Sequence, residues 1–205
     1  MELIIRQTDK SEFYQTEHLT REAFWNIYKP GCDEHLVLHQ IRESTGYIEE
    51  LDHIAIYEGE IVGHAISSKA RVIDKRGRVH EVLCIGPISV SPSFQNKGIG
   101  MELLNHSISE AKKMGFKGMI LFGNPDYYHR FGFTNAKEFE ITTKDLQNFE
   151  PFMALELRDN GLCNVKGRFF EDEAFTIKED EIIEFEKKFP VKEKGKPRVD
   201  ISQLI

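Results

Sequence analysis

The feature that most constrains the fold is a strand, helix, strand unit in the middle of the chain. A long strand is expected over 80–90, and an amphipathic helix begins after a short loop. The apolar residues of that helix recur every three or four positions, at Ile99, Leu103, Leu104, Ile108, Ala111 and Met114. Gly115 ends the helix, and 118–122 is a continuous apolar run typical of a buried strand. This order predicts a right-handed crossover with two parallel strands.

The segments around this unit predict a mixed sheet in a single domain. Upstream we expect a strand at 3–6, helices at 10–28 and 35–42, and a meander of 53–57, 61–66 and 80–90. Downstream we expect a short helix opened by Asn124 and Pro125, a strand at 139–142, a hairpin of 152–157 with 164–170 and a helical turn at 180–188. The predicted class is therefore α/β (α+β), with one domain over 1–170. Residues 171–205 are expected to be a C-terminal extension of that domain, with a solvated basic tail at 192–198.

Composition narrows the classes of protein. The 205 residues include only three cysteines, Cys32, Cys84 and Cys163, whose wide spacing favours neither a disulfide framework nor a metal site. We therefore expect a cytoplasmic protein, and the N-terminus lacks the pattern of a secretory signal. The net charge of −7 disfavours a nucleic-acid partner, and no apolar run is long enough for a membrane span.

Charge is unevenly distributed along the chain. Residues 69–117 carry nine basic and four acidic side chains, whereas residues 1–68 carry five basic and thirteen acidic ones. The basic centre could bind a small polyanion. The alternative interpretation is that the uneven charge is random variation over a solvated surface.

The segment from Ile88 to Gly100 carries the chemical signal. A strand ends there, a loop follows, and Gly98 and Gly100 stand at the mouth of the predicted helix. Glycines let a ligand approach the backbone closely, and free amides at a helix N-terminus bind phosphate. The spacing matches neither a dinucleotide fingerprint nor a P-loop. Tight packing of the helix against a strand is the structural alternative.

Three motifs here resemble the GCN5-related N-acetyltransferase (GNAT) superfamily. Gln95-x-x-Gly98-x-Gly100 is similar to the family's coenzyme A pyrophosphate motif, and Ile88 to Pro92 is similar to the end of its preceding strand. Gly123 to Phe133 reads Gly-Asn-Pro-x-Tyr-Tyr-x-Arg-Phe-Gly-Phe, which resembles a subgroup of predicted bacterial N-acetyltransferases. The resemblance implies a GNAT-like acyl-CoA N-acyltransferase fold, whose mixed, mostly antiparallel sheet splays into a V flanked by helices.

The resemblance also implies binding roles for matched positions. The pantetheine arm would pair with the strand at Ile88, Ser89 and Val90, as an added strand would. Gly86 and Pro87 fit an opening there, because proline cannot donate to a ladder; a simple kink is the alternative. The pyrophosphate would be held by backbone amides around Gln95, Asn96, Lys97, Gly98, Ile99 and Gly100.

The implied catalytic residue is Tyr128, which matches the family's tyrosine by its spacing to Gly132. Its phenol would protonate the leaving thiolate or donate a hydrogen bond to it, whereas the alternative role is packing. Tyr127 is the competing candidate by residue type. Asn124 would bond the pantetheine or cap a helix. No general base is assigned. The candidates Glu81, His80, His64 and His129 are each interpreted as ordinary strand or surface residues, and a chain of waters could also accept the proton.

The expected function is acetyl-CoA-dependent N-acetyltransfer to a primary amine of a small molecule or peptide, by direct attack. Acetyl-CoA would be the co-substrate, with no metal, and exposed sheet edges would suit a homodimer. The alternative is a non-catalytic acyl-CoA-binding or regulatory domain of the same fold. An interaction module without a cofactor would leave the Gly98 and Gly100 mouth unexplained.

Overall fold

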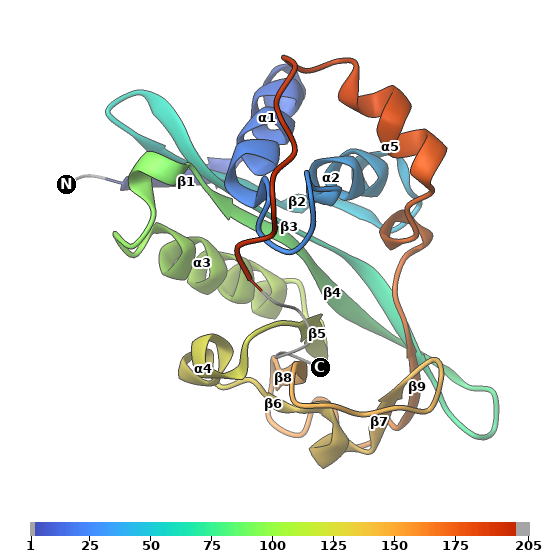
Figure 1. Ribbon diagram of the computed structural model, residues 1–205. Helices are drawn as coiled ribbons and strands as arrows, with labels where there is room; N and C mark the ends of the chain where they lie inside the picture. The colour runs from blue at the N-terminus through green and yellow to red at the C-terminus, as the bar shows by residue number, and fades with distance from the viewer. Residues whose placement is uncertain (1–2, 200–205) are drawn as a thin grey trace.

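The computed structural model describes residues 3–199 as one mixed sheet flanked by helices (Figure 1). The helices are α1 (Phe13–Phe24), α2 (Glu34–Glu43), α3 (Ile99–Lys113), α4 (Pro125–Tyr128) and α5 (Glu179–Glu186). The strands are β1 (Leu3–Gln7), β2 (Tyr47–Tyr57), β3 (Glu60–Ile73), β4 (Val79–Val90), β5 (Gly118–Phe122), β6 (Thr134–Asn135), β7 (Ile141–Thr143), β8 (Phe152–Glu156) and β9 (Gly167–Phe170). The main path of the sheet runs β1-β2-β3-β4-β5-β8-β6, and β9 pairs with β3 and β7.

The pleat of the central strands divides the core between the two faces of the sheet. Neighbouring residues of a strand point to opposite faces, so Ala65 packs with Ile99 and Leu103 of α3, while Ile66 packs with Leu38 and other residues of α2. Helix α3 therefore covers one face, and α2 covers the other.

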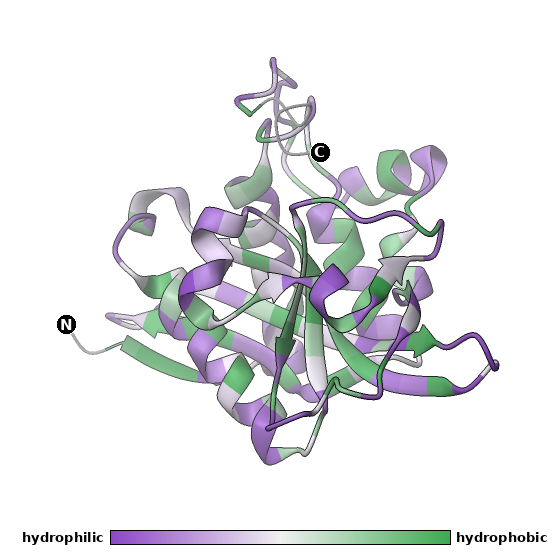
Figure 2. Ribbon diagram, turned by 90° about the horizontal axis from the view of Figure 1, so that it is seen from below, coloured by the Kyte–Doolittle hydropathy of each residue, from purple (hydrophilic) through white to green (hydrophobic). Residues whose placement is uncertain are grey.

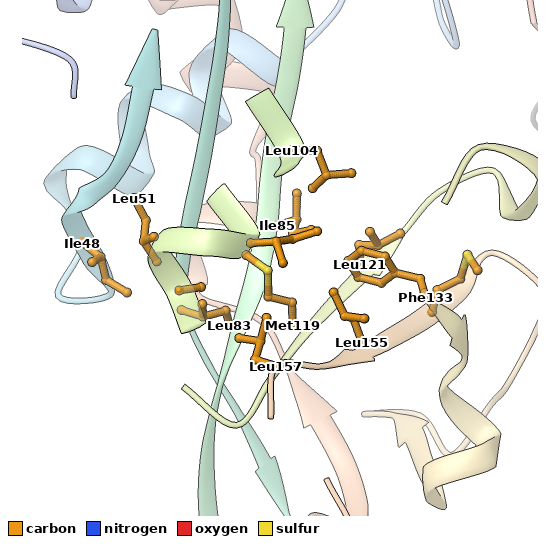
Figure 3. Close-up of a cluster of buried hydrophobic side chains, with 13 residues drawn as sticks. Ile48, Leu51, Leu83, Ile85, Leu104, Met119, Leu121, Phe133, Leu155 and Leu157 are labelled. Atoms are coloured by element: carbon orange, nitrogen blue, oxygen red, sulfur yellow. The ribbon is translucent and has the colours of Figure 1, made fainter. Parts of the chain in front are cut away.

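The largest cluster of buried apolar side chains lies beneath α3. Leu83 and Ile85 of β4, Met119 and Leu121 of β5, and Leu155 of β8 contribute to it (Figure 3). Along the ribbon, hydrophobic and hydrophilic residues alternate within helices and strands, and hydrophilic residues gather at the tip of the β3–β4 hairpin (Figure 2). This pattern is expected of elements with one buried side.

The sheet opens between β4 and β5, which are parallel. Their pairing is limited to Leu83 with Met119 and Cys84 with Ile120, and β4 continues to Val90 beyond that point. On its other side β4 stays paired with β3, with a register shift between Ala65 and Ser67 that falls opposite Gly86–Pro87. The predicted V and the predicted bulge are both present. The edge of β4 that faces β5 is thus left without a strand partner over 85–90 within the described chain.

A buried charge network ties α2 to the sheet. The carboxylate of Asp52 accepts hydrogen bonds from Arg42 Nε at 2.8 Å, Thr8 Oγ1 at 2.6 Å and the Tyr47 hydroxyl at 3.2 Å, and His64 Nε2 lies 2.8 Å from it. Burial alone would raise the pKa of Asp52, but the hydrogen bonds and charges of His64 and Arg42 outweigh it and hold the pKa well below its usual value. A buried charge is tolerated here because each lone pair meets a donor.

The C-terminal extension packs against α1 and α2. Arg21 of α1 donates to Glu186 of α5 at 2.9 Å and to the Pro190 carbonyl at 3.1 Å. Phe185 and Phe189 join Leu36 of α2 in a small apolar cluster. The predicted domain over 1–170 and the predicted extension are therefore in direct contact. The boundary at residue 170 stays a prediction.

The last described segment, residues 190–199, runs down beside α1 to the loop that joins α1 to α2 (Figure 1). There the Arg198 amide donates to the Asn26 carbonyl at 2.9 Å, and the Val199 amide donates to the Ile27 carbonyl at 2.9 Å. The Asn26 side chain accepts from the amides of Gly31 and Gly195, at 2.8 and 3.0 Å. The predicted solvated tail is exposed, as expected, but its backbone is bound to this loop. Residues 200–205 of the predicted extension lie outside the described residues.

Three local predictions were wrong. Helix α1 ends at Phe24 rather than near 28, because Trp25 turns out of the helix and its indole donates to the Glu193 carbonyl at 2.9 Å. Residues 136–139 form a 3-10 turn, so the strand expected at 139–142 begins only at Ile141. The segments 152–157 and 164–170 do not form a hairpin, since β8 pairs with β5 and β6 whereas β9 pairs with β3 and β7.

Candidate functional site

The loop between β4 and α3 presents a row of free backbone amides. Asn96 and Gly98 have φ of 61° and 86°, a left-handed conformation that turns successive N–H groups the same way, and Gly98 is the N-cap of α3. The helical hydrogen bonds of α3 begin at Met101 and Glu102, whose backbone amides both donate to the Gly98 carbonyl. Among residues 3–199, none of the six amides from Gln95 to Gly100 has a protein acceptor.

These amides border a hollow of about 670 Å³ between the end of β4, the mouth of α3 and α4. The hollow is narrow at Gly100, because a Cβ built there would lie 3.2 Å from the Tyr127 hydroxyl and 3.7 Å from Val90 Cγ2. The hollow is lined by Ile88, Val90, Phe94, Gln95, Asn96, Gly98, Ile99, Gly100, Met101, Tyr127, Tyr128 and Arg130. It therefore joins the unpaired edge of β4 to the free amides.

Cationic side chains flank this region. The Lys97 ammonium lies 4.7 Å from the centre of the Phe94 ring, and the Arg130 guanidinium lies 5.0 Å from the centre of the Tyr127 ring. The mouth of a helix already carries partial positive charge. Free amides, a helix N-terminus and nearby cations together suit a phosphate or pyrophosphate group.

The two tyrosines of α4 differ in their surroundings. The Tyr127 hydroxyl lies close to Gly100, while the Tyr128 ring packs edge-on against Phe133 with centroids 5.7 Å apart. Burial, reinforced by the neighbouring phenols of Tyr127 and Tyr28, raises the pKa of Tyr128 well above its usual value. Its hydroxyl is therefore protonated at neutral pH and can donate a hydrogen bond, while the raised pKa makes it a weaker acid than a free phenol.

Three predicted binding residues do not line the hollow with their side chains. Ser89 faces α1, where its hydroxyl lies 2.8 Å from that of Thr20, and the Lys97 side chain lines a second hollow toward β1. Asn124 caps α4 by accepting from the Asp126 amide at 3.0 Å, and this leaves only its NH₂ group for a ligand. The backbone groups of Ser89 and Lys97 remain beside the site.

None of the four side chains considered as a general base lies in the hollow. His64 is fully buried in the Asp52 network, and His129 Nδ1 lies 2.9 Å from the Phe133 carbonyl oxygen. His80 sits near Asp74, and Glu81 is exposed beside Lys69, both on the β3–β4 hairpin.

Sequence reasoning missed Phe94, Met101 and Arg130 as lining residues. Phe94 and Met101 flank the glycine motif and could have been found by counting outward from it. Arg130 lies three residues after Tyr127, a helical spacing that places both side chains on one side of a turn.

The fold is an open, mostly antiparallel mixed sheet flanked by helices, in which a strand edge is left unpaired beside the mouth of a helix. The comparisons with known proteins agree with this class of fold. Residues 9–133 match the model of the acetyltransferase (GNAT) family. The chain therefore belongs to the GNAT family, as its motifs predicted.

Two curated relatives come from Escherichia coli. The uncharacterized N-acetyltransferase YjhQ of strain K12 is 32% identical over 128 residues, which are 62% of this chain and 66% of YjhQ. The uncharacterized N-acetyltransferase YhbS of the same strain is 23% identical over 110 residues, which are 54% of this chain and 64% of YhbS. The match thus spans slightly less than two thirds of each relative.

Solved structures show the same fold. The YhbS protein of Escherichia coli in complex with CoA aligns with a TM-score of 0.75 at 21% identity, covering 85% of this chain and 92% of that one. A GNAT family acetyltransferase of Brucella melitensis in complex with acetyl-CoA aligns with a TM-score of 0.68 at 22% identity, covering 85% and 99%. Across residues 3–199, no helix is both long and apolar enough to cross a membrane.

Proposed function

We propose that this protein is an acetyl-CoA-dependent N-acetyltransferase that moves an acetyl group to a primary amine of a small molecule or peptide. The observation that carries the proposal is the row of six free amides beside the unpaired edge of β4. Family membership and the CoA-containing structures of similar proteins support it.

The fit of acetyl-CoA rests on the backbone. The amides from Gln95 to Gly100 would hold the pyrophosphate, and Gly100 leaves the space that a phosphate oxygen needs, because a Cβ there would fill the gap below Tyr127. The free edge of β4 at Ile88 and Val90 would pair with the amide groups of the pantetheine arm. Acetyl-CoA supplies an activated acetyl group as its thioester.

The opening of the V would place the thioester between β4 and β5. An N–H near Val90 would polarise the thioester carbonyl, and the Tyr128 hydroxyl would donate to the sulfur as the C–S bond breaks. The Asn124 NH₂ group, free because only its oxygen is used in the cap, would bond the pantetheine.

The test combines binding with transfer. Calorimetry of the purified protein should show saturable binding of acetyl-CoA, and a screen of polyamines, amino acids, aminoglycosides and peptide N-termini should reveal acceptors through thiol release. Binding without any transfer would favour a non-catalytic acyl-CoA-binding domain. Absence of binding would overturn the proposal.

A further inference from the structure

The last residue of β5 presents an aromatic ring to solvent. All 15 phenylalanines of the chain lie within residues 3–199, and Phe122 is the only exposed one among them, at 42%. Its ring is held by stacking on Phe152, with centroids 5.0 Å apart and planes at 20°, and on Phe149, with centroids 5.8 Å apart and planes at 24°. Because these neighbours fix the orientation of the ring, its exposed side is a preformed apolar surface.

Phe122 is joined to the proposed reaction centre through the residue that follows it. A Cβ built on Gly123 would overlap the Tyr128 ring and would lie 3.0 Å from Leu121 Cδ1. The Tyr128 ring therefore lies directly against the backbone of Gly123. This backbone is held in place, because the Gly123 amide donates to the Pro151 carbonyl at 2.9 Å. One residue of backbone thus separates Phe122 from the residue that packs against Tyr128.

Phe122 and Tyr128 lie on opposite faces of the sheet. Leu121 and Tyr128 belong to the apolar cluster beneath α3. Ile120 and the two phenylalanines stacked on Phe122 belong to a second cluster, and side chains alternate along a strand, so Phe122 shares the face of Ile120. That face is the one covered by α2, because Phe175 packs against both the second cluster and the cluster of α2.

Phe122 also borders the opening between β4 and β5. Cys84 pairs with Ile120 where the two parallel strands are still together, so the next positions on the same face are Gly86 of β4 and Phe122 of β5. Gly86 packs beneath α2, since a Cβ built there would lie 3.0 Å from Ile41 Cδ1. On the α2 face, the opening is therefore bordered by Gly86 on one side and by the exposed ring on the other.

The proposed acetyl-CoA site occupies the other face. Its hollow lies at the mouth of α3 and beside α4, whose two tyrosines pack against the cluster beneath α3. With the thioester between β4 and β5, the α2 face is the side from which a second substrate can reach it, past Phe122.

We propose that Phe122 forms the wall on which the acceptor binds, and that the acceptor is a primary amine with an aromatic group on a short alkyl chain. The inference rests on the proposed N-acetyltransferase activity and names its substrate class. An aromatic group placed on the exposed side of Phe122 extends an existing stack, and aromatic pairs are favoured beyond the burial of their area. A short chain suffices, because Phe122 and the residue against which Tyr128 packs are chain neighbours. A small hydrophilic amine gains nothing from this surface.

The experiment measures kcat/KM for 2-phenylethylamine and for ethylamine by thiol release from acetyl-CoA. Both are primary amines on a two-carbon chain, and they differ in the phenyl ring. The wild type should favour 2-phenylethylamine by about 10- to 100-fold, the gain expected from burying a phenyl group. Phe122→Ala should bring this ratio close to one, mainly through a higher KM for 2-phenylethylamine. Phe122→Tyr keeps the ring and should keep most of the preference.

The ratio is independent of how much of a variant is folded, because both amines are assayed on the same sample. Met114→Ala is the matched control: this apolar side chain is 43% exposed at the C-terminal end of α3, and its loss should leave the ratio unchanged.

A wild-type ratio near one, or the same ratio in Phe122→Ala, would overturn the role of Phe122 alone. An unchanged ratio together with a smaller mass of Phe122→Ala in light scattering would overturn it too, and would make this face an interface between two copies of the chain. A wild type that binds acetyl-CoA but acetylates neither amine, nor any amine of the screen, would overturn the proposed function itself.

Discussion

Replacing Gly100 with alanine should separate ligand binding from stability. Gly100 is the second residue of α3 and has ordinary helical backbone geometry, so alanine is compatible with it and is the better helix former by up to about 1 kcal/mol. The new Cβ would meet the Tyr127 hydroxyl at 3.2 Å, a contact relieved by a shift of a few tenths of an ångström. The free energy of unfolding should therefore stay the same or rise slightly.

The same methyl group should weaken acetyl-CoA binding. It would stand between the free amides and Tyr127, where the proposed pyrophosphate must approach the backbone. Loss of one charge-assisted hydrogen bond is worth about 1.5–3 kcal/mol, and about 1.4 kcal/mol corresponds to a tenfold change in Kd. We expect the Kd for acetyl-CoA to rise by about 10- to 100-fold.

The assay is calorimetric titration with acetyl-CoA, together with thermal unfolding of the same samples. Ser109→Ala is the matched control, because it changes helix propensity on the exposed side of α3, far from the mouth. Gly98→Ala adds a contrast: it meets no atom within 4 Å, but its φ of 86° should lower stability by about 1 kcal/mol. A Gly100→Ala protein with the wild-type Kd would refute the placement of the pyrophosphate.

Three further predictions concern catalysis, stability and the C-terminal segment. Tyr128→Phe should slow single-turnover transfer by about 10²–10⁴-fold with little change in acetyl-CoA binding, whereas equal slowing in Tyr127→Phe would point to general damage. Asp52→Ala should reduce the free energy of unfolding, measured by denaturant titration, by about 3–5 kcal/mol because Arg42 would keep a buried charge without its main partner; a loss below about 1 kcal/mol would contradict this. Asn26→Ala should speed hydrogen exchange at the two amides it accepts from, measured by mass spectrometry, and leave acetyl-CoA affinity unchanged; unaltered exchange would show that the segment is held by other contacts.

The parts of the fold that follow local rules were predictable from the sequence. Helix α3 shows an apolar face at helical spacing and ends at a glycine, and it lies within one residue of its predicted bounds. Proline in β4 pointed to the bulge, because it cannot donate to a neighbouring strand. In both cases the signal and its structural consequence lie within a few residues of each other.

The parts that failed depend on distant partners. The segments of β8 and β9 alternate as strands do, yet alternation does not say which strand each one joins, and they pair with β5 and β3. Likewise α1 stops at Phe24 because Trp25 bonds a carbonyl 168 residues away in the sequence.

The proposed coenzyme A site and the loop that joins α1 to α2 differ in which parts of the chain support them. The coenzyme A site consists of β4, the mouth of α3 and α4, all within the residues 9–133 that match the family model. The loop that joins α1 to α2 also lies in that range, but the segment bonded to it, residues 190–199, does not. A relative that shares only the matched range can keep the free amides and still present a differently held loop. Likeness over that range therefore argues for a shared co-substrate, and it leaves the acceptor amine to be determined on this chain itself.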